Sequence, residues 1–315
     1  MQSLPLFYYP TTWLWVDDDP ILMNTMVGAF PATQKIRTFS SASDCLAFLK
    51  SYASATMAHA LLSDADEDET ASSPHQSPLK LDLKKVMALA QNTDRLNDVS
   101  LMITDFQMPE IDGLMLAEKT QTIPIQKILL TGNGKEEDAV RGFNQNTIHR
   151  FVKKSSDTMH AELKKHAQIL SHYYFSQLTK PLLTCLEAEG ASPLSDPVFI
   201  DTFQTYCLQN HITEYYLIDK NGSFLCIDNQ GKYSYFVVHT AKSLLEWRSI
   251  YGNELSDEIK SACGAEKMIP FFGAGKEAWE IPVAEWSKHF YPAAILEGRE
   301  KYLYAIVMDG GIEWR

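Results

Sequence analysis

The chain has 315 residues, of which 45% are apolar and 22% are charged, and its formal net charge is −12. At about 150 residues per domain this length predicts two domains, and the composition is typical of a folded globular protein rather than a disordered one. Both halves of the chain are acidic, so a general affinity for the phosphate backbone of nucleic acids is not expected.

The cysteines and the N-terminus bear on the cellular compartment. The five cysteines contain no CxxC pair, which predicts reduced thiols in a cytoplasmic protein rather than a disulfide framework or a zinc site. The N-terminal segment is apolar, but it has no basic region or small-residue cleavage site, and three aspartates follow it. No apolar run approaches the roughly 18 residues of a membrane span. We therefore expect neither a signal peptide nor a membrane helix.

Residues 1–155 alternate short apolar runs with helical patterns. The predicted strands cover residues 11–16, 35–39, 99–104, 125–130 and 148–152. One predicted helix begins at Pro20, and three more cover residues 41–52, 112–120 and 136–143. Strands that alternate with helices through short connections predict an α/β fold, a doubly wound, five-stranded parallel sheet covered on both faces.

One connection in this region is unusually long. The segment between positions 17 and 105 is longer than the roughly 45 residues that a helix, a strand, a second helix and short loops need. The additional residues fall at about 53–97. Residues 63–78 are acidic and rich in serine and proline, which predicts a disordered surface loop, and residues 80–91 have the apolar spacing of a helix. An insertion that the fold tolerates and that has no function is as good an interpretation of this segment as a functional one.

A long helical pattern links the two halves of the chain. It begins at Ser156 and runs to about Thr179, which is longer than a helix that only covers a sheet, so we interpret its last part as a connector that ends at Pro181. A new helix is predicted to begin with Asp196 as its N-cap and Pro197 at its first position.

The remainder of the chain has the pattern of hairpins. Residues 215–227 form a predicted hairpin around Asn221-Gly222, and residues 232–238 a further strand. A helix at residues 241–251 and a second hairpin at residues 293–308 follow. We therefore divide the chain into residues 1–177, with the insertion at about 53–97, and a C-terminal α+β domain at 178–315 with a mainly antiparallel sheet.

Charged and hydroxyl side chains follow the predicted parallel strands. Asp17, Asp18 and Asp19 come directly after the first strand, and Asp105 follows the third. Thr131 ends the fourth strand and Lys154 the fifth. These side chains should converge, because the functional crevice of an open parallel sheet lies outside the carboxyl ends of its strands. Clustered carboxylates favour a hard cation such as Mg²⁺, and a lysine and a hydroxyl beside them would bind phosphoryl oxygens.

The segments VDDDP, ITDFQMPEIDG, LLTG and FVKK occur in this order at the strand ends. With them, residues about 10–177 resemble the receiver domain of two-component response regulators. The resemblance implies that Asp105 accepts a phosphoryl group from a sensor histidine kinase or a phosphotransfer protein. It implies that Asp17, Asp18, Asp105 and the backbone carbonyl of Gln107 hold Mg²⁺.

The same resemblance implies roles for residues on the last two strands. Thr131 and Lys154 would contact the phosphoryl group, and Phe151 has the place of the aromatic switch residue. We further expect a homodimer, formed through the fourth and fifth strand-helix units of the receiver. Two features depart from the family: Ser155 stands where receivers have proline, and Lys153 is adjacent to Lys154. Counting from Phe151 favours Lys154 as the site lysine.

Three weaker patterns remain. The GNGK and GAGK segments, at residues 132–135 and 273–276, lack the full phosphate-loop pattern, so nucleotide binding is not expected from them. His160, His166 and His172 recur every six residues, which scatters them around a helix as surface residues. Aromatic residues between positions 206 and 236 predict a β core rather than a ligand cage.

The C-terminal half has no basic recognition helix, no phosphate loop and no GGDEF or EAL segment. Its segments YYLIDKNGSFLCID, YSYFVV and KYLYAIVMDG resemble a PAS-type or related α/β sensory module. We predict a phosphorylation-switched interaction domain that binds neither nucleic acid nor membrane. An enzyme or nucleotide-binding output regulated by phosphorylation is the alternative, and an atypical transcriptional regulator a lesser one. No enzyme motif is recognisable, so the expected catalysis is the receiver's own phosphorylation and dephosphorylation.

Overall fold

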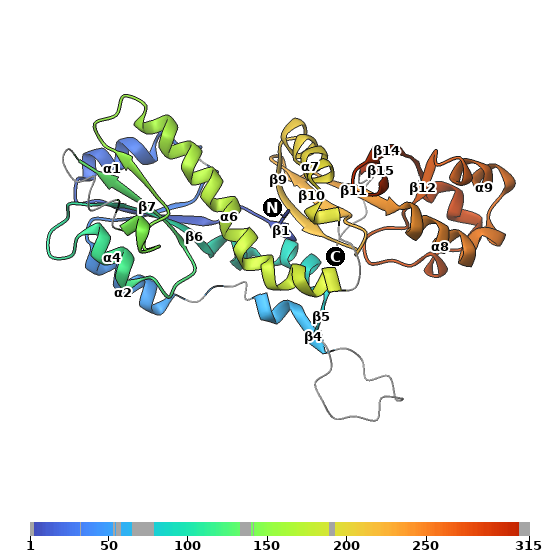
Figure 1. Ribbon diagram of the computed structural model, residues 1–315, viewed down its shortest axis with the longest axis horizontal. Coiled ribbons are helices and arrows are strands. Elements are labelled where there is room, and N and C mark those ends of the chain that lie inside the picture. Colours follow the sequence, from blue (N-terminus) through green and yellow to red (C-terminus); the bar gives the residue numbers. More distant parts are fainter. Residues whose placement is uncertain are drawn as a thin grey trace. The chain divides into compact units, whose positions relative to one another are not determined.

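The computed structural model describes residues 3–31, 33–52, 54, 58–64, 79–132, 140, 142–188 and 193–308. The chain forms two compact units, coloured along the sequence in Figure 1. The parallel-sheet unit comprises Pro10–Met57 and Thr93–Leu178. The antiparallel-sheet unit comprises Met1–Tyr9, Ala58–Asn92 and Thr179–Arg315. Among the described helices, none combines the length and the apolar character that crossing a membrane requires.

The parallel-sheet unit is built on five strands in the order β3-β2-β6-β7-β8, and all neighbours are parallel. The strands are β2 (Thr12–Val16), β3 (Ile36–Phe39), β6 (Val99–Asp105), β7 (Gln126–Thr131) and β8 (Arg150–Lys153). Every residue of β2, β6 and β7 is buried. This confirms the predicted fold, in which the continuous apolar runs are central strands covered on both faces.

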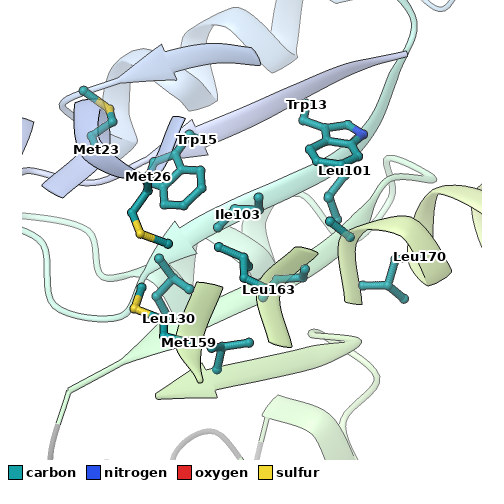
Figure 2. Packing of buried hydrophobic residues seen from close by; sticks show 13 residues of the cluster. Trp13, Trp15, Met23, Met26, Leu101, Ile103, Leu130, Met159, Leu163 and Leu170 are labelled. Carbon is teal, nitrogen blue, oxygen red and sulfur yellow. The ribbon is translucent and has the colours of Figure 1, made fainter. Parts of the chain in front are cut away.

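Helices cover both faces of this sheet. They are α1 (Pro20–Val27), α2 (Ala42–Ser51), α4 (Gly113–Lys119) and α6 (Met159–Ala188). On one face, Trp13 and Trp15 pack with methionines of α1 and with Leu163 of α6, as Figure 2 shows. On the other face, Leu14 and Val16 pack with side chains of α2 and α4. The two faces separate because successive side chains of a strand point to opposite sides. The predicted helix at 136–143 lies largely outside the described residues.

The antiparallel-sheet unit has six strands in the order β1-β9-β10-β11-β15-β14. They are β1 (Phe7–Tyr8), β9 (Ile212–Leu217), β10 (Phe224–Asp228), β11 (Tyr233–Thr240), β14 (Ala294–Glu297) and β15 (Lys301–Met308). Both predicted hairpins form, and all pairs are antiparallel as expected. Gly222 has a φ of 94° in the first hairpin turn, which explains the Asn-Gly sequence there.

The other elements of this unit lie around that sheet. They are α3 (Leu83–Ala88), α7 (Pro197–Gln209), α8 (Ala241–Tyr251), α9 (Asp257–Gly264), β4 (Leu62–Asp64), β5 (Leu79–Leu81), β12 (Met268–Pro270), β13 (Phe290–Pro292) and short 3-10 turns. Phe203 of α7 stacks on Phe224 with ring centroids 4.4 Å apart and meets Phe236 edge-on. The aromatic residues singled out in the sequence are therefore a β core, as predicted.

The unit boundaries differ from the predicted division at residue 177. Strand β1 pairs with β9, with Phe7 opposite Tyr216 and Tyr8 opposite Tyr215, so the N-terminus belongs to the antiparallel-sheet unit. The insertion belongs there too, since residues 58–92 form β4, β5 and α3, and α3 contacts β9. The helix predicted at 80–91 is shorter than expected, because β5 occupies its first residues. The predicted loop at 63–78 lies largely outside the described residues.

Helix α6 is longer than predicted. It continues through Pro181 to Ala188, so the prediction that it ends at Pro181 is wrong. Leu182, Leu183 and Leu186 are buried beyond the proline. Their burial supplies the apolar contacts that keep the chain helical where the proline removes one backbone hydrogen bond.

Candidate functional site

Four residues at the carboxyl ends of neighbouring parallel strands lie together. Asp17 follows β2, Asp105 ends β6, Thr131 ends β7, and Lys154 follows β8. The Nζ atom of Lys154 lies 2.9 Å from Oδ2 of Asp17 and 2.9 Å from Oδ2 of Asp105. The backbone N–H of Lys154 donates to the carbonyl of Thr131 at 2.8 Å, so this lysine is held in place although Ser155 follows it. Lys153 is exposed at the end of β8.

Three carboxylates form an acidic cluster at this edge. Asp17, Asp18 and Asp105 place carboxylate oxygens within 4.8 Å of one another, and they are the only such group among the described residues. Asp17 is fully buried, Asp105 is 6% exposed and Asp18 is open to solvent. Hard oxygen donors with one solvent-facing side suit Mg²⁺, which retains several waters when a protein binds it. The side chains present therefore fit a divalent cation.

The residues beside this cluster have separate tasks. The backbone N–H of Gln107 donates to the Asp105 carboxylate, while the use of its carbonyl as a metal ligand stays a prediction. Asp19, the third aspartate of the run, caps α1 by accepting from the N–H groups of Ile21 and Leu22. Its own N–H donates to Oδ1 of Asp17 at 3.0 Å. The run of three aspartates thus divides into two cluster acids and one helix cap.

The charges of the site are unbalanced. Burial raises the pKa of the Asp105 carboxyl above its usual value, the hydrogen bond and charge of Lys154 oppose this shift, and the charge of Asp17 adds to it. Burial by itself would lower the pKa of Lys154, but its bonds to Asp105 and Asp17 raise it, so the ammonium stays charged. One ammonium therefore neutralises only part of the charge of two buried carboxylates, and a second cation would stabilise the site.

Thr131 carries an unsatisfied polar group. Its side chain is 1% exposed, and its hydroxyl oxygen has no hydrogen-bond partner among the described residues. A hydroxyl in this state can donate to or accept from a group bound at the edge of the sheet. Phe151, the predicted switch residue, is half-buried against a small apolar cluster that includes Phe106, Leu129 and Ile148.

The loop from β6 to α4 folds back onto Asp105. The N–H of Gly113 donates to the carbonyl of Phe106, and a Cβ atom on Gly113 would lie 2.0 Å from the carbonyl oxygen of Asp105. Only glycine permits this close approach. Glu110 has a φ of 65° in the same loop, and Asp112 caps α4. The sequence segment MPEIDG therefore fixes the backbone that carries Asp105.

The weaker sequence patterns form no second site in the described part of the chain. Lys276 donates its N–H to Gly273 at 3.2 Å, which closes a turn, and only a short 3-10 turn follows it. The GNGK segment extends beyond the described residues. His160 is exposed on α6, but His166 and His172 are partly buried, so the prediction of three surface histidines is wrong for these two.

Solved structures of a response regulator and of receiver domains are similar to this chain. The chain is similar to the structure of the Legionella pneumophila response regulator LqsR, with 26% identity, a TM-score of 0.80, and coverage of 98% of this chain and 90% of that chain. Other similar structures include the signal receiver domain of an HD domain-containing protein from Pseudomonas fluorescens and a CheY-like receiver domain protein from Methanospirillum hungatei. Their identities are 16% and 13%, and their TM-scores 0.36 and 0.35. Each covers 53% of this chain and 98% of its own.

No protein-family model matches the chain, and no curated protein matches it by sequence. The predicted resemblance to response regulators is nevertheless confirmed by the likeness to LqsR, which extends over both units.

Proposed function

We propose that this chain acts in a phosphorelay, in which Asp105 accepts a phosphoryl group from a histidine kinase or a phosphotransfer protein. The observation that carries the proposal is the meeting of Asp105 with Lys154 and Asp17, at 2.9 Å on each side of the ammonium. The unpartnered hydroxyl of Thr131 on the neighbouring strand supports it. So does the likeness to a solved response regulator over most of the chain.

In the proposed reaction, a carboxylate oxygen of Asp105 attacks the phosphorus of a phosphohistidine. The new P–O bond forms as the P–N bond breaks, and the imidazole nitrogen of the donor retains the electron pair. Such transfers depend on positioning and on neutralisation of charge. Mg²⁺, held by Asp17, Asp18 and Asp105, would supply positive charge to the phosphoryl oxygens when bound.

The chain's own residues complete the acceptor site. The ammonium of Lys154 would donate to a phosphoryl oxygen in place of its present bond to Asp105, while it keeps its bond to Asp17. Thr131 would donate its hydroxyl hydrogen to a second phosphoryl oxygen. Its movement toward that oxygen would open space beside β7 and β8 into which Phe151 can turn. A local change of charge would thereby alter the surface of the parallel-sheet unit.

We propose that this altered surface changes homodimerisation through the fourth and fifth strand-helix units, which include β7, β8 and α6. We also propose that the antiparallel-sheet unit is an output that binds a protein partner. Its acidic charge disfavours nucleic acid as that partner. We place the reaction in the cytoplasm. The five free cysteines of the chain agree with a reducing compartment.

The proposal is tested by labelling the protein with radioactive acetyl phosphate and Mg²⁺. We expect stoichiometric label on the wild type and none on Asp105→Asn, because the amide is not a nucleophile for phosphorus. Asp19→Asn is the matched control: it changes an acid of the same run that caps α1, and asparagine caps equally well. Equal labelling of the wild type and Asp105→Asn would overturn the assignment of Asp105.

A further inference from the structure

A cavity of about 240 Å³ lies between the end of α1 and the first turns of α6, within the parallel-sheet unit. It shares no residue with the site around Asp105. Its volume is slightly below the roughly 300–1,000 Å³ of pockets for drug-sized ligands, so it suits a smaller molecule. The residues that line it come from both helices and from the turn after α1: Met26, Ala29, Phe30, His160, Ala161 and Lys164.

The wall on the α1 side is apolar, and the core of the unit fixes it. Met26 is 1% exposed and belongs to the cluster of buried residues in Figure 2. The ring of Phe30 meets the rings of Trp13 and Trp15 edge-on, with centroids 5.4 and 6.4 Å apart. The N–H of Phe30 donates to the carbonyl of Val27 at 3.1 Å. This wall therefore exists before a ligand arrives, which lowers the entropic cost of binding.

The wall on the α6 side carries a positive charge. His160 and Lys164 are four residues apart and both exposed, so they lie on one face of the helix at the opening of the cavity. Among the described residues, the ammonium of Lys164 has no ion pair or hydrogen bond. Helix α1 has no charged side chain, and Glu162, the nearest acid along α6, accepts from the hydroxyl of Thr158. A ligand with a negative charge would therefore complement this wall.

We propose that the cavity binds a small aromatic carboxylate, with its ring against Met26 and Phe30 and its carboxylate on the ammonium of Lys164. The volume is about eight times the roughly 30 Å³ that a water molecule takes in the liquid, so a ligand of about eight to ten non-hydrogen atoms fits. A thioether and an aromatic ring in the wall favour an aromatic ligand, because both make favourable contacts with ring edges and faces. The proposal does not depend on phosphorylation of Asp105.

Benzoate is the probe, and the full-length protein with ¹³C-labelled methionine methyl groups reports its binding by NMR. We expect the Met26 methyl signal, assigned with Met26→Leu, to shift and saturate with a Kd of about 1 mM or less. The signal of Met102, which packs on the other face of the sheet, should not move. Benzamide has nearly the same shape but no charge, and at the same ionic strength it should bind at least about threefold more weakly.

Three variants locate the site. Lys164→Ala should weaken benzoate binding by about threefold or more, and Lys165→Ala is the matched control, because Lys165 is exposed on the same helix but does not line the cavity. Ala161→Leu fills the cavity and should abolish binding. Unchanged signals of the other methionines show that each variant is folded. The proposal would be overturned by an unsaturable shift of Met26, by equal affinity for benzoate and benzamide, or by equal effects of the two lysine variants.

Discussion

Asp105 combines two conditions that oppose each other in a folded protein. It is buried beside a second carboxylate, which disfavours its charge, and it contacts an ammonium, which favours it. The balance leaves the pKa of Asp105 above its usual value near 3.8. A carboxylate in this state is a more basic nucleophile than an ordinary surface aspartate, and the site becomes more stable when another cation joins it.

This balance predicts how stability depends on pH. Between 3.8 and the raised pKa of Asp105, the native state binds more protons than the unfolded state, so the contribution of Asp105 to the free energy of unfolding falls as the pH rises through that window. We therefore expect Asp105→Asn to have a higher Tm than the wild type at pH 7 without divalent cations. The difference should shrink as the pH is lowered through the raised pKa of Asp105 toward 3.8, because Asp105 then becomes protonated in the native state.

Thermal unfolding over a pH series, with Asp19→Asn as the control, checks this expectation. Added Mg²⁺ should raise the Tm of the wild type and reduce its deficit relative to Asp105→Asn, because ligands that bind only the native state stabilise it. A lower Tm for Asp105→Asn at pH 7 would mean that the bond to Lys154 outweighs the cost of burial.

At the scale of elements, the loop between β6 and α4 controls the nucleophile through its backbone. Gly113 begins α4, and its Cα lies so close to Asp105 that an added Cβ would overlap the carbonyl oxygen. Glu110 adopts a positive φ two residues before the helix cap Asp112, which costs about 1 kcal/mol or more for a residue with a side chain. Hydrogen bonds hold the loop in this conformation: the N–H of Gly113 donates to the carbonyl of Phe106, and Asp112 accepts from the N–H of Met115.

We expect Gly113→Ala to lower the free energy of unfolding by about 3 kcal/mol or more, since the overlap forces the backbone of Asp105 to move. The variant should also lose most of its labelling by acetyl phosphate. Gly28→Ala is the matched control: Gly28 ends α1 at a φ of −64°, and alanine there should change stability by less than about 1 kcal/mol. Urea unfolding of both variants measures the difference, and similar losses would refute the close approach at Gly113.

At the scale of the molecule, segments distant in sequence build the antiparallel-sheet unit. Leu6, Phe7 and Tyr9 are fully buried, and the N–H of Leu217 in β9 donates to the carbonyl of Leu6 at 2.8 Å. Only residues 9–11 separate β1 in this unit from β2 in the other. A fragment that begins at residue 178 would therefore lack an edge strand and the insertion helix α3.

Phe7→Ala tests this assignment. The variant removes a fully buried ring, which costs about 3–5 kcal/mol, and we expect the loss to fall on the antiparallel-sheet unit. Its unfolding by urea should shift to lower concentration, while acetyl phosphate still labels Asp105 in buffer without urea. Ile21→Ala, a change at a side chain that is 78% exposed on α1, should alter stability by less than about 0.5 kcal/mol. Loss of labelling in Phe7→Ala would show that β1 supports the acceptor site directly.

The amino-acid sequence by itself was enough to predict the parallel sheet, both hairpins and the order of the site residues. Buried strands are continuous apolar runs, tight turns need Asn-Gly, and parallel strands bring their carboxyl ends to one edge; these rules act over a few residues. For this reason Asp17, Asp105 and Lys154 could be expected to meet although 137 residues separate the first from the last.

Which unit each segment joins and where α6 ends depend on contacts that form only in the folded chain. Phe7 and Tyr8 have no sequence signal that names β9 as their partner, because pairing between distant strands depends on which edge is free in the folded sheet. The local sequence around Pro181 predicts a helix end. The helix continues because burial of the leucines beyond Pro181 stabilises it by more than the loss of one hydrogen bond costs. The different roles of Asp17, Asp18 and Asp19 also depend on the folded structure, because their partners lie on another strand and on α1.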